Sequence, residues 1–305
     1  MKHINFIQRL IMPLPELERY YRERRKELYE QNIKLKNIEL RKRIYPLFHI
    51  FLKVDRLFRG QSIKVLGEHK KFSGPVIFAC THIGQNDLEN IYETIRHSCW
   101  WFLGDPKELY KEISGLLISL NGGIFLDTGN KTDRQIAYAR SVELLQSNGS
   151  LMIFPEGARN GSENLPVMPL FVGTAKMAME TNTSIVPVAI EQYDKRFFIK
   201  FGEALQPQEY NSPAKLTQTL RDTLATLKWE IWEQEGLQSR NSIPTVYSKI
   251  FLDEFERRIY PYDTLESVER TRYHTKEELE QKDAFAHLDK LIPCKENAFL
   301  FRKRN

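Results

Sequence analysis

Residues 75–87 read Pro-Val-Ile-Phe-Ala-Cys-Thr-His-Ile-Gly-Gln-Asn-Asp, an apolar run that passes directly into polar residues. The first six residues, 75–80, have the length and composition of a short buried strand. A strand end that leads into the start of a helix is where α/β folds place ligands. This stretch therefore predicts a strand, a polar turn at its carboxyl end, and a helix that follows.

Outward from this stretch, residues 61–205 alternate short apolar runs with longer amphipathic ones. That alternation is typical of a sheet built from strand–helix–strand units. The predicted fold class is therefore α/β: a mixed, largely parallel sheet with helices on both faces, an N-terminal two-helix extension and a helical C-terminal region. Strands are expected at 63–66, 75–80, 100–103, 123–126, 151–154, 185–190 and 197–201.

Three helices carry start or stop signals at their ends. The predicted parts of the chain are a helical extension over 1–58, an α/β domain over 59–210 and a helical region over 211–305. Residues 240–305 contain no pattern that indicates a function. The helix signals are Thr132-x-x-Gln135 with Asn148-Gly149 as a stop, Ser212-Pro213 with Gly236 as a stop after about 235, and Thr275-x-x-Glu278.

The N-terminal extension concentrates the positive charge. Residues 1–60 hold 15 Lys and Arg against 7 Asp and Glu, a net charge of +8, which leaves −3 for the remainder of a chain of +5. From Ile44 to Phe58 apolar residues recur every three or four positions, which predicts a helix that Pro46 either starts or kinks. Its apolar face either packs on the core or lies among anionic lipid headgroups. Interleaved glutamates indicate a solvated helix and argue against nucleic acid as the partner.

The sequence predicts a cytoplasmic protein that reaches the inner face of the membrane only peripherally. The uncharged stretch 113–126 is 14 residues long. A spanning helix needs about 20 apolar residues. No signal-peptide pattern is visible at the start of the sequence. The three cysteines include no pair at metal-binding or redox spacing, which fits a reducing compartment.

The first candidate catalytic group is His82 with Asp87. The two side chains cannot share one face of a regular helix, but they meet if His82 lies in the turn and Asp87 in the first helical turn. Asp87 then orients the imidazole and leaves its other nitrogen free to take a proton, as in Ser-His-Asp triads. A histidine beside a strand is more often structural, so the pair alone leaves both interpretations open.

The second candidate group is Glu156, Gly157 and Arg159, which follow the strand expected at 151–154. An arginine binds phosphate through two parallel hydrogen bonds, and glycine lets the backbone approach a substrate closely. Glu156 is expected to accept from a substrate hydroxyl or to hold Arg159. The alternative is a Pro-Glu-Gly turn that leaves Arg159 on the surface.

Taken together, the patterns resemble the glycerophospholipid acyltransferase family, which includes bacterial lysophosphatidate (1-acylglycerol-3-phosphate) acyltransferases. The resemblance covers about residues 60–206 and preserves the order and spacing of four family blocks. The blocks are His-x4-Asp at His82 and Asp87, the Gly-x-x-Phe-(Ile/Leu)-Asp type at 122–127, the Phe-Pro-Glu-Gly type at 154–160, and the Ile-Val-Pro-Val strand at 185–188.

The resemblance implies a mechanism and a set of partners. His82 acts as the general base, Asp87 orients it, and Glu156, Gly157 and Arg159 bind the acceptor. The acyl group comes from a thioester of coenzyme A or of acyl carrier protein, which is a co-substrate, so neither a cofactor nor a metal is expected. The helical extension over 1–58 is implied to dock on the membrane.

One departure from the family pattern concerns the acceptor. Thr128 stands where the family commonly has an arginine that helps bind phosphate. Arg134 and Lys131 are the nearby basic residues that are candidates to take the place of that arginine. This departure favours a different acceptor, such as another lysophospholipid, a glycolipid or a glycan, as an alternative to lysophosphatidate. A non-enzymatic lipid-binding descendant is the second alternative, although the four polar candidates argue against it.

Overall fold

The computed structural model describes residues 4, 6–68, 71–104, 111, 118, 120–162, 165–236 and 247–274 of the 305-residue chain. Residues Met1–Tyr273 form one compact unit. The predicted division at residues 58 and 210 stays a prediction.

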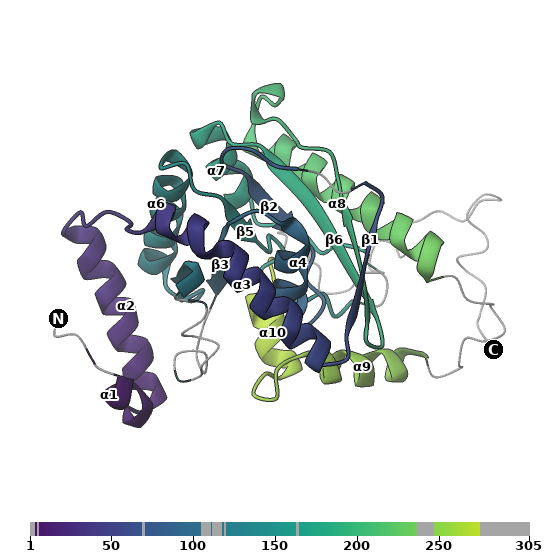
Figure 1. The fold of residues 1–305 in the computed structure, drawn as a ribbon, viewed down its shortest axis with the longest axis horizontal. Helices are drawn as coiled ribbons and strands as arrows, with labels where there is room; N and C mark the ends of the chain where they lie inside the picture. Colours follow the sequence, from purple (N-terminus) through teal and green to yellow (C-terminus); the bar gives the residue numbers. More distant parts are fainter. Residues whose placement is uncertain are drawn as a thin grey trace, which may run out of the picture. The chain divides into compact units, whose positions relative to one another are not determined.

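A seven-stranded mixed sheet forms the centre of this unit (Figure 1). The strand order is β1-β7-β6-β2-β5-β3-β4; β6 and β7 pair antiparallel, and the other neighbours pair parallel. The predicted fold class is therefore confirmed, and each predicted strand is present. The strands are β1 (Ser62–Leu66), β2 (Ile77–Cys80), β3 (Trp100–Gly104), β4 (Gly123–Leu126), β5 (Leu151–Ile153), β6 (Ile185–Tyr193) and β7 (Arg196–Phe201).

Helices cover both faces of the sheet because the central strands are apolar on both sides. On β2, Ile77 and Ala79 belong to one buried cluster, and Phe78 and Cys80 belong to the other. The first cluster includes side chains of α6 (Lys131–Gln146), α7 (Gly173–Thr181) and α8 (Pro213–Glu235). The second includes side chains of α3 (Ile38–Phe58) and α4 (Asp87–Ile95).

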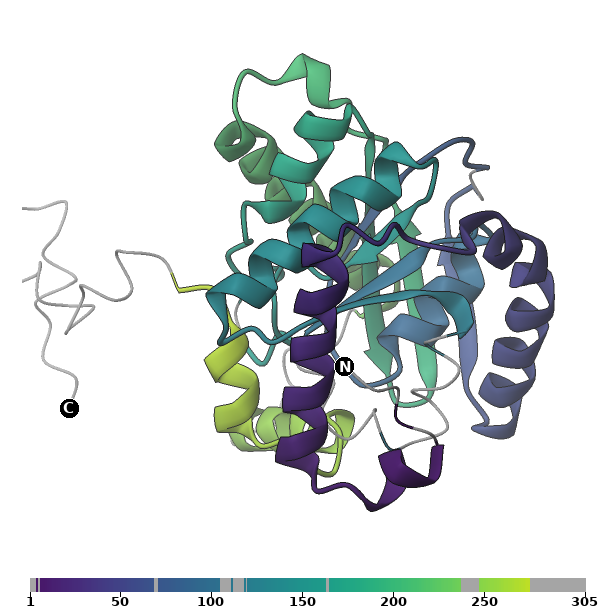
Figure 2. The same cartoon turned by 90° about the vertical axis from the view of Figure 1, so that its left-hand side faces the viewer.

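The second N-terminal helix, α3, ends at Phe58 as predicted but begins at Ile38, before the predicted start. After α1 (Phe6–Ile11), α2 covers Leu14–Glu30 and lies against α6 (Figure 2). Asn32 and Asn37 take positive φ angles of 53° and 64°, and this separates α2 from α3 within the stretch expected to be helical. Asparagine tolerates that conformation better than most residues. Pro46 neither starts nor ends α3 but lies inside it.

The helix signals were right for α8 and for the stop of α6 at Asn148-Gly149, and wrong for the start of α6. The Ser212 side chain accepts from the backbone N–H of Lys215, and Gly236 follows the last turn of α8. In α6 the cap is Asn130, and Thr132 lies inside the helix. Asn130 is the cap because its side chain accepts from a backbone N–H of the first turn. The box predicted at 275–278 lies outside the described residues.

The described C-terminal helices pack beside the turn after β5. The 3₁₀ helix η2 (Pro207–Glu209) precedes α8, and α9 (Tyr247–Arg258) and α10 (Leu265–Thr271) follow it. Phe255, Ile259 and Val268 form a buried cluster with Ala158 and Met168. Of the described helices, none has the length and apolar content that crossing a bilayer requires.

Candidate active site

The two candidate turns lie side by side because β2 and β5 are parallel neighbours. Ala79 pairs with Ile153 in their register, so both strands end at the same edge of the sheet. The backbone N–H of Asn160 donates to the carbonyl of His82 at 2.7 Å, which joins the two turns directly. The two groups that the sequence singled out, 69 residues or more apart, therefore share one site.

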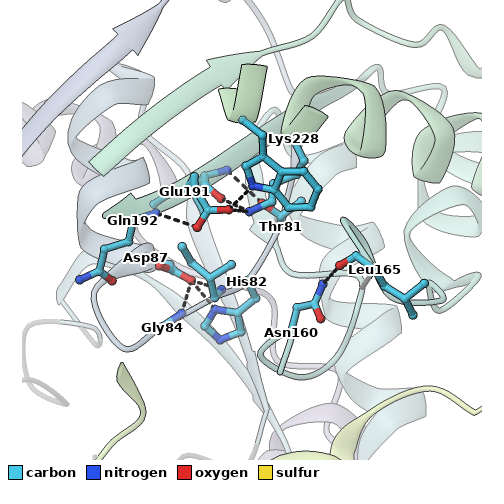
Figure 3. Close-up of polar contacts among 12 residues, drawn as sticks. Thr81, His82, Gly84, Asp87, Asn160, Leu165, Glu191, Gln192 and Lys228 are labelled. Carbon is cyan, nitrogen blue, oxygen red and sulfur yellow. Dashed lines mark hydrogen bonds and ion pairs between the residues drawn. The ribbon is translucent and has the colours of Figure 1, made fainter. Parts of the chain in front are cut away.

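His82 and Asp87 meet through a hydrogen bond, as the sequence predicted (Figure 3). His82 lies in the turn after β2, and Asp87 is the first residue of α4. Asp87 Oδ2 lies 2.8 Å from His82 Nδ1 and also accepts from the backbone N–H groups of Ile83 and Gly84. Because these donors favour the carboxylate, Nδ1 carries the proton and Nε2 keeps its lone pair.

The surroundings of His82 keep its imidazole neutral. Burial is the main cause that lowers the pKa of His82, and Asp87 opposes it by its hydrogen bond and its charge. The ring stacks on Phe154 with centroids 4.2 Å apart, and the side chain keeps 18% of its surface exposed. Within the described part of the chain Nε2 has no hydrogen-bond partner, so a neutral imidazole has a free acceptor on the cavity wall.

A buried ion pair holds the strand beside this turn. Thr81 Oγ1 accepts from the backbone N–H of Ile190 on β6 at 3.0 Å. The next residue, Glu191, accepts from Lys228 Nζ at 2.5 Å and from the Trp232 indole at 2.6 Å (Figure 3). Lys228 and Trp232 belong to α8, so this helix holds β6, and β6 in turn holds Thr81 at the start of the turn.

Glu156 bonds to backbone and does not line the cavity. One carboxylate oxygen accepts from the N–H of His82 at 3.0 Å, and the other accepts from the N–H of Met168 at 2.8 Å. Its pKa is raised to about 7, chiefly by burial. In this structure Glu156 therefore positions the backbone of His82 and does not hold Arg159. Contact between Glu156 and an acceptor stays a prediction.

Gly157 lines the cavity with a φ of 74°, a conformation that other residues rarely adopt. A Cβ atom there would lie 2.3 Å from the Phe171 ring and 2.9 Å from the carbonyl oxygen of Thr271. The turn after β5 therefore requires glycine, for its backbone angle and for the close approach of two other segments.

Arg159 is held by a residue that the sequence did not single out. Its Nη1 lies 2.7 Å from Asp263 Oδ2, and its guanidinium lies 4.9 Å from the centre of the Tyr260 ring. Both charged side chains are largely buried, with 13% and 17% of their surface exposed. The guanidinium expected to bind phosphate therefore already has a carboxylate partner.

A cavity of about 890 Å³ adjoins these groups. His82, Arg159 and Asp263 are among the polar groups that line it, together with Asp127, Arg134 and Arg272, and the larger part of its wall is apolar, as is usual in ligand sites. No cluster of three or more potential metal-binding side chains occurs among the described residues. The apolar wall includes Phe48, Leu52, Trp101, Ile153, Phe171 and Met177.

Thr128 stands where an arginine was expected, and the structure shows which nearby basic residue lies at the site. Arg134 lines the cavity and donates to the carbonyl oxygen of Thr128 at 2.5 Å, whereas Lys131 is not part of the wall. Asp127, next to Thr128, accepts from Arg22 of α2 at 2.9 Å. Of the two replacements considered from the sequence, only Arg134 is placed at the site.

Residues 260–272 are the part of the site that the sequence did not reveal. Tyr260, Tyr262, Asp263 and Arg270 line the cavity, although they belong to no motif and lie about a hundred residues beyond the turn after β5. The sequence held one local signal there, a capping box formed by Thr264 and Ser267, and that signal predicts a helix and not a site.

A buried carboxylate–imidazole pair at the carboxyl edge of an α/β sheet, beside an apolar cavity, is an arrangement that general-base sites use. A family model described as Acyltransferase matches residues 62–191, which hold both turns. Residues 62–191 therefore carry an acyltransferase domain, and the chain is similar to lysophosphatidate acyltransferases.

Two curated relatives are similar to this chain. The chain is 26% identical over 154 residues to a 1-acyl-sn-glycerol-3-phosphate acyltransferase of Saccharomyces cerevisiae, covering 50% of each protein. It is 28% identical over 124 residues to the protein of that name in Borreliella burgdorferi, covering 41% of this chain and 46% of the relative. The chain thus spans about half the length of these relatives.

A solved structure supports the fold. The crystal structure of the 1-acyl-sn-glycerophosphate acyltransferase PlsC from Thermotoga maritima aligns with a TM-score of 0.54 and 18% identity. The alignment covers 70% of this chain and 88% of that one. At this identity the likeness concerns the fold alone.

Proposed function

We propose that this chain transfers a fatty acyl group from an acyl thioester to a free hydroxyl of a lysophosphatidate-like glycerolipid. The observation that carries the proposal is the His82–Asp87 pair, which presents an unprotonated Nε2 to an apolar cavity. Relatives that match this chain are named as enzymes of that reaction.

The mechanism uses one proton carrier. Nε2 of His82 takes the proton of the acceptor hydroxyl as its oxygen attacks the thioester carbonyl. Asp87 stabilises the resulting imidazolium through the Nδ1 hydrogen bond. Collapse of the tetrahedral intermediate forms the new ester and breaks the carbon–sulfur bond, and the departing thiolate takes the proton back from His82.

The test is acyl transfer from acyl-coenzyme A and from acyl carrier protein to lysophosphatidate and other lysolipids, by the wild type and His82→Ala. General bases typically contribute about 10²- to 10⁴-fold, so the variant should lose at least about a hundredfold in kcat. Asp222→Asn, which removes an exposed carboxylate of α8, is the control and should retain full activity. An active His82→Ala variant would refute the assignment of the base, and inactivity of the wild type would favour the lipid-binding alternative.

A peripheral position at the membrane is part of the same proposal. The outward face of α3 exposes apolar side chains, and the opposite face places Phe48 and Leu52 in the cavity wall. An interfacial helix of this kind brings a lipid acceptor next to its binding site. The exposed apolar residues are Leu40, Leu47, Ile50, Phe51, Val54, Leu57 and Phe58, with Arg43 and Lys53 also exposed.

Flotation with vesicles of anionic and of neutral lipid tests this position. The Leu47→Asp, Ile50→Asp double variant should lose vesicle binding, and high salt should weaken binding to anionic vesicles. Trp229→Asp removes an exposed apolar side chain from α8 and should bind as the wild type does. Equal binding by the wild type and the double variant would contradict the role of α3.

A further inference from the structure

The C-terminal segment 247–273 is built into the wall of the cavity. The carbonyl oxygen of Arg258 accepts from the N–H of Gln85, in the turn after β2, at 2.8 Å. The carbonyl oxygen of Thr271 approaches the turn after β5, where it would lie 2.9 Å from a Cβ atom at Gly157. Segment 247–273 lies beyond the region that the family model matches, so it can add side chains to the site that the acyltransferase domain does not supply.

Arg272 follows the last residue of α10 and lies near Arg159. Both side chains line the main cavity, and both also line a neighbouring cavity of about 530 Å³, so they lie in the part of the wall that the two cavities share. The Arg272 side chain is 18% exposed, and its Nε lies 2.7 Å from the carboxylate of Glu269, which is 58% exposed. An ion pair with a partner this exposed contributes little, so an anionic ligand can replace Glu269 at small cost.

Arg159 is held by one nitrogen and has another that lacks a partner. Its Nη1 binds Asp263 Oδ2, whereas its Nε is buried without a hydrogen-bond partner among the residues that the structure describes. A buried donor without an acceptor costs free energy, and an oxygen of a bound ligand would remove that cost. Phosphate oxygens suit this position because a guanidinium donates two parallel hydrogen bonds to a phosphate group.

The charged side chains of the main cavity leave positive charge in excess. Among the described residues, four arginines and three carboxylates line it. Two charged groups outside the wall, Arg22 at Asp127 and Glu269 at Arg272, offset each other. Glu89 is only partly ionised at neutral pH, because burial raises its pKa to about 7. A phosphate monoester carries a charge of about −1.5 to −2 at that pH, so the wall suits such a group. The arginines are Arg134, Arg159, Arg270 and Arg272, and the carboxylates are Glu89, Asp127 and Asp263.

We infer that Arg272 is a specificity-determining residue, which binds the phosphate monoester of the acceptor lipid together with Arg159. The inference rests on the acyl transfer proposed above and names the second guanidinium of the headgroup site, which Thr128 does not provide. Asp263 holds Arg159 through Nη1 and leaves Nε for a phosphate oxygen, and Arg272 exchanges its exposed carboxylate partner for another. Arg270 lines the same cavity but is exposed, so its contribution is small.

The experiment measures the steady-state kinetics of Arg272→Gln with lysophosphatidate and acyl-coenzyme A. The KM for lysophosphatidate should rise by about tenfold or more, the size expected for a lost hydrogen bond between charged groups. Coenzyme A also carries a phosphate monoester, so the KM for acyl-coenzyme A is measured in parallel and should not change. The kcat at saturating acceptor should not change either, because Arg272 binds the headgroup equally before and during the reaction.

Two further variants separate binding from folding. Arg272→Lys keeps the charge and loses the planar fork, so its KM for lysophosphatidate should lie between the values of the wild type and Arg272→Gln. Arg257→Gln removes an exposed arginine of α9 outside the cavity and should behave as the wild type does. Thermal melts should show that each variant is folded, and Arg272→Lys carries the test if Arg272→Gln proves unstable.

Each outcome bears on a different statement. An unchanged KM for lysophosphatidate, or a rise in the KM for acyl-coenzyme A instead, would overturn the role of Arg272 at the acceptor and leave the acyltransferase proposal standing. A lower kcat together with a lower melting temperature would assign Arg272 a structural role and overturn its role in specificity as well. No transfer to lysophosphatidate by a folded wild type, with either thioester donor, would overturn the proposed function and this inference together.

Discussion

Replacement of Asp87 by asparagine tests the negative charge of this residue separately from the hydrogen bonds that it accepts. Among the described residues Asp87 takes part in three hydrogen bonds, all on Oδ2, and Oδ1 is buried without a partner there. An asparagine whose carbonyl oxygen takes the place of Oδ2 accepts the same three donors. The imidazole keeps its tautomer and orientation, and only the negative charge is lost.

The size of the effect follows from that loss. Hydrogen bonds to charged groups contribute about 1.5–3 kcal/mol and neutral ones about 0.5–1.5 kcal/mol, so the imidazolium of His82 loses roughly 1–2 kcal/mol of stabilisation. That corresponds to a rate about 5- to 30-fold lower. Asp87→Ala also frees the imidazole to rotate, so its loss should approach that of His82→Ala.

The assay is release of the free thiol from acyl-coenzyme A at saturating acceptor, with thermal melts of each variant. Asp222→Asn again serves as the control. If Asp87→Asn matched the wild type, the carboxylate charge would have no part in the reaction. If it were as inactive as His82→Ala while still folded, the neutral oxygen would not be preserving the orientation of the ring.

Three further outcomes are expected. Because burial lowers the pKa of His82 below 6.5, the rate of acyl transfer should stay level down to about pH 6.5 and fall only below it. The free energy of unfolding should also fall below that pH, since His82 of the unfolded chain takes up a proton before His82 of the folded chain does. Gly157→Ala should lower stability by about 1–3 kcal/mol in chemical denaturation, whereas Gly173→Ala, where a Cβ meets nothing within 4 Å, should not. Lys228→Met leaves Glu191 as a buried, uncompensated charge and should cost about 3–5 kcal/mol, much of which Glu191→Gln should restore in the double variant.

The sequence by itself determined the local elements of this protein. Apolar runs of four to six residues between turn signals were enough to locate each strand, since a strand buried on both faces needs only that pattern. Ser212 and Gly236 bounded α8 because caps act within one helical turn. The spacing of His82 and Asp87 was enough to predict their contact, because one lies in the turn and the other at the start of the helix that follows it.

Only the tertiary structure decided which distant groups meet. The strand order places β2 beside β5, which joins the two turns, and no local pattern encodes that order. Local signals also misplaced the start of α6, where Asn130 and not Thr132 accepts from a backbone amide of the first turn. The partner of Arg159 lies 104 residues away, in a segment without a motif. A contact of this kind depends on how α9 and α10 pack, and packing is a property of the whole chain.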